Sequence, residues 1–302
     1  MISSGEKRGS RVEPDTNLFT YLTLEGRRVI ENKIKGLDRE YAEGKRRLLE
    51  DVVSATRNYP GVLRSESLLR GVLEALQAYG YSLKVCRVKA QWRVLAGAGG
   101  VFGKIPFEVG LSFDPVLNLP YIPGSSLKGA FRDALFRLAE KEKGLKKAEE
   151  IADCVFGSND SVGLVGVTDA YPVALGVDGL LFEPDVLTPH YPGAKDELDV
   201  SPNPVPFLTV AREVQFEFYV YFNSELRRKL SDERPGGDHK LECVEHILEE
   251  DLMEAVSKRG GDVNLVPLVD RAVLYALARG VGAKTSLGYS RFELVEYKYV
   301  RG

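Results

Sequence analysis

Residues 280–292 read G-V-G-A-K-T-S-L-G-Y-S-R-F and lie between an apolar helical pattern and an apolar alternating pattern. The three glycines in this stretch let the backbone take positive φ and approach a ligand without a Cβ in the way. Successive backbone N–H groups can then converge on an anion, with Lys284 adding a charge and Thr285 and Ser286 adding donors. The stretch therefore predicts an anion-binding loop between a helix and a final strand.

A second segment, residues 120–132 (P-Y-I-P-G-S-S-L-K-G-A-F-R), places similar residues at the start of a helix. We predict that Ser125 or Ser126 caps this helix, whose backbone donors and dipole attract phosphate at that end. Lys128 and Arg132 are four residues apart and share one helix face. A plain cap with a solvated basic face would explain the same residues. The two segments together favour a polyphosphate ligand that is held rather than cut.

Nucleotide hydrolysis is one alternative for the lysine–threonine pair of the glycine loop. A Walker A loop needs glycine where this chain has Ala278 and Ala283. Such a loop also follows a strand and opens a helix, whereas residues 280–288 precede a strand. We therefore do not expect a P-loop. A second alternative stays open, in which the glycines only turn the chain from helix to strand.

Composition sets broad limits on the partners of the chain. The 302 residues carry a net charge of -3, which argues against a uniformly basic nucleic-acid binder but leaves room for a local basic groove. The three cysteines are far apart, so we expect no disulfide framework and a reducing, cytoplasmic location. No run of apolar residues is long enough to span a membrane, so we expect no membrane partner.

The order of predicted elements indicates an α+β fold. Helical patterns cover residues 18–58, 62–79, 125–143, 146–156, 241–258 and 266–279, and strand patterns cover 81–96, 162–168, 180–187, 207–222 and 289–299. After residue 80 the order is strand, helix, strand, strand, helix, strand, as in the split βαβ or ferredoxin-like fold. We therefore predict a helical extension at 1–80, a ferredoxin-like domain at 81–302, and an inserted long loop or hairpin at 188–206.

Several other residues have side chains that could take part in catalysis, metal binding or ligand binding. His190 lies in the long loop near Lys195, where it could act as a general base for RNA cleavage, stack on a base, or hold the loop. His239, Cys243, His246 and Glu250 share one helical face, which would suit zinc but is more often a polar helix surface. Trp92 is expected in the core, although its basic neighbours leave a ligand-facing surface open.

Taken together, the two glycine-containing segments resemble the RAMP superfamily of CRISPR-associated RNA-binding proteins. Residues 185–192 (D-V-L-T-P-H-Y-P) and 202–210 (P-N-P-V-P-F-L-T-V) are also similar to a subunit of the type III-B, or Cmr, effector complex. One position departs from the family pattern, because loops that often end G-Y-G here end with Ser290. We expect this serine to follow the turn only with a negative φ.

The resemblance implies an RRM-like ferredoxin fold with the glycine loop near the sheet where guide RNA passes. It also implies a non-catalytic subunit of an antiviral complex, without cofactor or metal, that caps the protein filament toward the 3′ end of the guide. The implied partners are the CRISPR guide RNA, its complementary target RNA, the backbone RAMP subunits, the small subunit and the first Cmr subunit. The expected RNA-binding residues are Gly124, Ser125, Ser126, Lys128, Arg132, His190, Lys195, Gly282, Lys284, Thr285, Ser286 and Gly288.

Two other functions remain as alternatives. One is an endoribonuclease that processes precursor CRISPR RNA with His190 as the general base. The other is a purely structural subunit that contacts only proteins. The two anion-binding segments argue against the structural subunit, whereas a cleavage assay comparing the wild type with His190→Ala separates RNA binding from the endoribonuclease.

Overall fold

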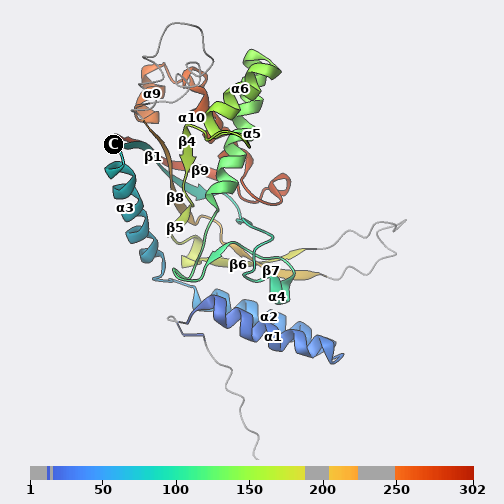
Figure 1. The fold of residues 1–302 in the computed structure, drawn as a ribbon. Coiled ribbons are helices and arrows are strands. Elements are labelled where there is room, and N and C mark those ends of the chain that lie inside the picture. The colour runs from blue at the N-terminus through green and yellow to red at the C-terminus, as the bar shows by residue number, and fades with distance from the viewer. Residues whose placement is uncertain (1–11, 14–15, 188–203, 224–248) are drawn as a thin grey trace, which may run out of the picture.

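The computed structural model describes residues 12–13, 16–187, 204–223 and 249–302 (Figure 1). Its helices are α1 (Leu18–Ile34), α2 (Asp38–Ala55), α3 (Val62–Ala78), α4 (Lys104–Phe107), α5 (Gly124–Lys143), α6 (Leu145–Phe156), α9 (Leu252–Lys258) and α10 (Leu268–Arg279). Its strands are β1 (Tyr81–Ala90), β2 (Phe113–Asp114), β3 (Leu119–Pro120), β4 (Val165–Val167), β5 (Tyr171–Ala174), β6 (Phe182–Leu187), β7 (Val205–Val210), β8 (Gln215–Asn223) and β9 (Phe292–Val300).

The central sheet has the strand order β4-β8-β1-β9, and β5 also pairs with β8. Every neighbouring pair is antiparallel. Along the chain, α5 lies between β1 and β4, and α10 lies between β8 and β9. This connection pattern confirms the predicted α+β, ferredoxin-like core.

Helices cover both faces of this sheet (Figure 1). On one face, α5 and α10 pack together, and Phe131 of α5 lies against Phe218 of β8 with ring centroids 6.0 Å apart. On the other face, Leu69 of α3 packs against Leu83 of β1 and Tyr219 of β8. An RRM stacks RNA bases on an open sheet face opposite its two helices. Because α3 occupies much of that face here, an RNA contact has to be sought elsewhere.

The helices α1 and α2 form an antiparallel pair beneath the β6–β7 hairpin (Figure 1). Their buried residues, including Leu22 and Leu49, belong to the same hydrophobic core as the sheet. At Gly26 the helix α1 comes so close to α4 that an added Cβ would lie 2.8 Å from the Ile105 carbonyl oxygen. The division into 1–80 and 81–302 stays a prediction, although these contacts tie the two parts together.

The β6–β7 hairpin is inserted between β5 and β8, and its pairing runs from Phe182↔Val210 to Leu187↔Val205. Residues 188–203, which connect β6 to β7 in the chain, lie outside the described residues, so most of the predicted long loop does too. The hairpin also corrects one expectation. We predicted a single strand over 207–222, but β7 ends at Val210 and β8 begins at Gln215, because Glu213 takes a φ of 63° in the intervening turn.

Two predicted helices also differ in extent. The pattern over 18–58 forms two helices, because Gly36 takes a φ of 72° and ends α1. Of the helix predicted at 241–258, the described part begins at residue 249, and α9 starts only at Leu252.

Candidate nucleic-acid interface

The glycine loop joins α10 to β9 and adopts the backbone that its sequence predicts. Gly280, Gly282 and Gly288 have φ values of 105°, 119° and 92°, and Lys284 has a φ of 57°. Residues Thr285–Leu287 form one short 3₁₀ turn between them. Gly282, Lys284 and Ser286 are exposed, whereas Thr285 and Gly288 are half-buried. The loop therefore presents its basic and hydroxyl side chains outward.

Part of the loop backbone is used to anchor it to the chain that follows β1. The N–H of Ala283 donates to the Leu95 carbonyl at 3.1 Å, and the N–H of Ser290 donates to the Arg93 carbonyl at 2.9 Å. The N–H of Val281 donates within the loop to the Ser290 carbonyl at 2.9 Å. These bonds fix the backbone of the loop against residues 93–95.

Ser290 corrects a second expectation, because its φ is 55° and not negative. The residue is fully buried, and its hydroxyl accepts a hydrogen bond from the Leu95 N–H at 3.0 Å. Ser290 forms three hydrogen bonds, through its N–H, its carbonyl and its hydroxyl, and these offset the left-handed backbone, which explains why a glycine is not required there.

The start of α5 is built differently from the prediction. The N-cap residue is Pro123, which has no side-chain hydrogen bond to give, and Ser125 and Ser126 lie inside the first turn. The predicted serine cap is therefore wrong. The Asp169 carboxylate accepts a hydrogen bond from the Gly124 N–H at 2.6 Å, so a carboxylate from another segment already meets the positive end of the helix. Gly124 itself is buried, and only Ser125 is exposed in this turn.

The two basic residues predicted on α5 differ in their surroundings. Arg132 forms an ion pair with Asp153 of α6, so much of its charge is matched within the protein. Lys128 is half-buried, and neither its side chain nor that of Lys284 forms a hydrogen bond or ion pair with the part of the chain that the structure describes. Lys128 and Lys284 are therefore the predicted cations best placed to meet an external anion.

A groove of about 590 Å³ lies where α5, α10 and the glycine loop meet. Thr285 and Ser286 of the loop line one side, and Ala130 lies on the α5 side, two residues after Lys128. The groove is lined by Ala130, Asp133, Ala134, Arg137, Tyr275, Ala276, Ala278, Arg279, Gly280, Thr285, Ser286 and Arg291. The two segments singled out in the sequence thus meet around one surface depression.

Three arginines make the lining of the groove positively charged. The sequence analysis did not name any of them as a site residue. Arg137 donates to the Asp133 carboxylate at 2.8 Å, and this hydrogen bond raises the pKa of its guanidinium. Arg279 donates to the Tyr275 hydroxyl at 2.6 Å, and Arg291 donates to the Thr285 carbonyl at 3.3 Å. Neither of these two bonds involves a carboxylate, so both charges remain available to a ligand.

Sequence signals for two of these arginines were present. Arg279 directly precedes Gly280, and Arg291 belongs to the quoted loop stretch itself. Arg137 had no such signal, because its place beside the loop depends on how α5 packs against α10.

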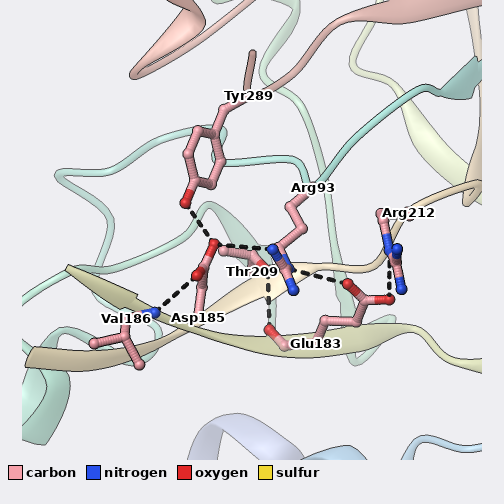
Figure 2. Close-up of polar contacts among 7 residues, drawn as sticks. All are labelled: Arg93, Glu183, Asp185, Val186, Thr209, Arg212 and Tyr289. Atoms are coloured by element: carbon pink, nitrogen blue, oxygen red, sulfur yellow. Dashed lines mark hydrogen bonds and ion pairs between the residues drawn. The ribbon is translucent and has the colours of Figure 1, made fainter. Parts of the chain in front are cut away.

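A network of charged side chains fixes the glycine loop to the base of the β6–β7 hairpin (Figure 2). Arg93 forms ion pairs with Glu183 at 3.0 Å and with Asp185 at 3.4 Å. Arg212 binds the other oxygen of Glu183 at 3.2 Å, and the Tyr289 hydroxyl donates to Asp185. Burial, followed by the hydrogen bond to Asp185, raises the pKa of Tyr289 to about 12. We call these five residues the hairpin clamp.

Other candidates from the sequence cannot be placed in the site. His190 and Lys195 lie outside the described residues, as do His239, Cys243 and His246 of the possible zinc group. Glu250 is described and binds Lys258 and Arg259 through its carboxylate. Among the residues that the structure describes, no three or more His, Cys, Asp or Glu side chains group as metal ligands, and no helix is long and apolar enough to cross a membrane.

Comparison with known proteins shows which family this chain belongs to. The sequence pattern of the RAMP superfamily matches residues 85–293, from β1 to β9, and so includes the loop, α5 and the groove. A curated protein of Saccharolobus solfataricus, the CRISPR system CMR subunit Cmr6, is 32% identical over 273 residues, which are 89% of this chain and 78% of that protein. The chain belongs to the RAMP superfamily and to its Cmr6 family.

A solved structure extends the likeness of this Cmr6-family chain to three dimensions. A chain in a cryo-electron-microscopy structure of the type III-B Cmr-beta bound to cognate target RNA is 28% identical, with a TM-score of 0.69. The match covers 95% of this chain and 93% of that chain. It therefore includes the N-terminal helices as well as the ferredoxin-like core.

Proposed function

We propose that this chain is a non-catalytic RNA-binding subunit of a type III-B effector complex and that it holds the backbone of a guide RNA. The observation that carries the proposal is the groove between α5, α10 and the glycine loop, with Arg279, Arg291, Thr285 and Ser286 on its walls. Its relatives support the same conclusion, because one is named as a Cmr subunit and the other belongs to a complex bound to target RNA.

The chemistry of the groove suits phosphate. A guanidinium group forms paired hydrogen bonds with phosphate oxygens, and hydroxyl groups add further donors. Lys284, which is exposed in the loop, and Lys128, which is half-buried on α5, add further charges on the two segments that meet at the groove. Contacts of this kind position an RNA strand without reading its sequence, which guide–target base pairing reads instead.

The net charge of -3 does not oppose this function. Binding depends on the potential near the ligand, and in the groove three arginines face one aspartate. The acidic remainder of the surface disfavours nonspecific binding of RNA elsewhere on the chain.

The family resemblance also supports an inference about the position of the subunit in the assembly. We infer that it caps the backbone filament toward the 3′ end of the guide, beside the backbone RAMP, small and first Cmr subunits, and that it acts in the cytoplasm. We assign no cutting residue to this chain, and we expect cleavage of target RNA to depend on a neighbouring subunit.

The test measures RNA affinity against salt concentration for the full chain, alone and assembled with the other subunits. Each phosphate neutralised on a single strand lowers the logarithm of affinity by roughly 0.7 per tenfold rise in salt. We expect Arg279→Gln and Lys284→Gln each to weaken binding and to reduce the salt slope by about 1 or less. Lys298→Gln is the matched control, because Lys298 is exposed at the opposite end of β9.

Two results would contradict the proposal. Equal affinity and equal salt slope in all three variants would remove the groove from RNA binding. Cleavage of precursor RNA by the wild-type chain that is lost in His190→Ala would identify an endoribonuclease instead.

A further inference from the structure

Trp92, the only tryptophan of the chain, lies on the surface next to the glycine loop. We expected it in the core, but the residue is 39% exposed. Trp92 lies just past the end of β1, where the chain leaves the sheet. An indole ring left partly open to water offers a large apolar surface that a ligand can cover.

Two guanidinium groups lie against this ring. The central carbon of Arg93 is 4.9 Å from the ring centroid, and that of Arg212 is 5.3 Å away. Both arginines bind the same buried carboxylate, since Arg93 takes one oxygen of Glu183 and Arg212 takes the other. The hairpin clamp therefore holds the arginines and, through them, the indole in a fixed arrangement before any ligand arrives.

Trp92 also adjoins the groove through the backbone. The N–H of Gln91 donates to the carbonyl of Arg291 at 2.9 Å, and the carbonyl of Arg93 accepts from Ser290 at 2.9 Å. Trp92 stands between these two bonded residues, and Arg291 lines the groove. The backbone of Trp92 therefore lies beside a residue whose side chain lines the groove.

These features match what proteins use to hold single-stranded nucleic acid. Such sites combine a cationic path for the backbone with aromatic rings on which bases stack, and arginine adds a cation–π contribution. A purely structural role would explain the arginine contacts with the ring. It would not explain why the ring stays open to water beside a cationic groove.

We propose that Trp92, oriented by Arg93 and Arg212, stacks an unpaired base of the RNA strand whose backbone lies in the groove. This inference rests on the proposed RNA-binding function and assigns to the same interface a contact with bases. It predicts a preference for single-stranded over duplex RNA at this site, because paired bases cannot leave their own stack without a penalty.

The experiment uses the single tryptophan as its own reporter. Purified full-length chain is titrated at low salt with an oligouridine, with an abasic ribose-phosphate oligomer of the same length, and with a duplex. Anisotropy of labelled RNA reports binding, and tryptophan fluorescence reports stacking. We expect the oligouridine alone to quench the fluorescence and to bind roughly 5-fold or more tighter than the abasic oligomer.

Variants separate stacking from phosphate binding. We expect Trp92→Leu to lose the preference for oligouridine while it binds the abasic oligomer as the wild type does. Trp92→Phe should retain part of the preference. Tyr79→Leu is the matched control, because Tyr79 is a 79% exposed aromatic residue at the C-cap of α3, beside the opposite end of β1. Circular dichroism checks that each variant is folded.

Each other outcome has a distinct meaning. Equal binding of both oligomers without quenching would overturn base stacking and leave the groove proposal intact. No binding of any oligomer, alone or in the assembled complex, would overturn both proposals. Unchanged RNA affinity of Trp92→Leu together with lost assembly would identify the ring as a contact with a neighbouring protein subunit and overturn the inference.

Discussion

Gly282 and Gly288 of the loop differ in the physical constraint that requires a glycine. A Cβ added at Gly282 would lie 2.9 Å from the Leu95 carbonyl oxygen, which is backbone that cannot rotate away. A Cβ added at Gly288 would meet nothing within 4 Å, although φ is positive at both residues. The first glycine is needed for space and conformation, and the second for conformation alone.

This difference gives a prediction at the residue scale. Gly282→Ala should lower the free energy of unfolding by about 2–4 kcal/mol, because left-handed strain and overlap with Leu95 add together. Gly288→Ala should cost about 1–2 kcal/mol from conformation alone. Chemical denaturation followed by circular dichroism measures both. If the two variants were equally stable, close packing of the loop on residues 93–95 would not explain Gly282.

At the scale of elements, the loop and the β6–β7 hairpin behave as one unit through the hairpin clamp. Glu183 sits in β6 with its side chain 6% exposed and binds two arginines from different segments. The Tyr289 hydroxyl adds a bond from the loop to Asp185 of the same strand. The clamp therefore sets the position of the hairpin base relative to the groove.

Removing the Glu183 carboxylate should weaken the hairpin clamp. Glu183→Gln removes the buried negative charge that Arg93 and Arg212 share, and we expect the free energy of unfolding to fall by about 1–3 kcal/mol. Amide hydrogen exchange should rise in β6, in β7 and at residues 289–291. Glu293→Gln is the control, since Glu293 is 57% exposed and pairs with Lys89 at the surface, where we expect less than about 1 kcal/mol. Faster exchange spread evenly over the chain would argue against a local clamp.

At the scale of the whole molecule, helices from the N-terminal part complete the core. The pair α1–α2 packs on the hairpin and on α4, while α3 packs on the sheet face opposite α5 and α10. Core residues of α1 and α2 belong to the same cluster as Phe216 and Phe218 of β8. We therefore expect the chain to unfold as one cooperative unit.

A pair of substitutions tests that expectation. Leu49→Ala in α2 should lower the free energy of unfolding of the whole chain by about 2–4 kcal/mol, with a single transition, because Leu49 is 4% exposed. Leu24→Ala on α1 should change it by about 0.5 kcal/mol or less, because Leu24 is 57% exposed. A separate early transition in Leu49→Ala, with the main transition unmoved, would show that residues 1–80 form an independent domain.

The sequence alone determined the features that depend on local pattern. Alternating and helical periods gave the order of the core elements, and the glycines of residues 280–288 predicted a turn with positive φ. These properties are encoded within a few consecutive residues, so a reader of the chain can recover them. The break between β7 and β8 escaped this reading, because Glu213 carries no glycine-like signal for its left-handed turn.

Tertiary structure alone decided what surrounds the candidate site. Asp169 meets the start of α5 across 45 residues of chain, and Arg137 reaches the groove only because α5 packs against α10. The cover of α3 over the sheet and the exposure of Trp92 depend in the same way on where distant segments come to rest. Local patterns specify backbone conformation and which faces are apolar, whereas contacts between distant segments follow from how those faces pack together.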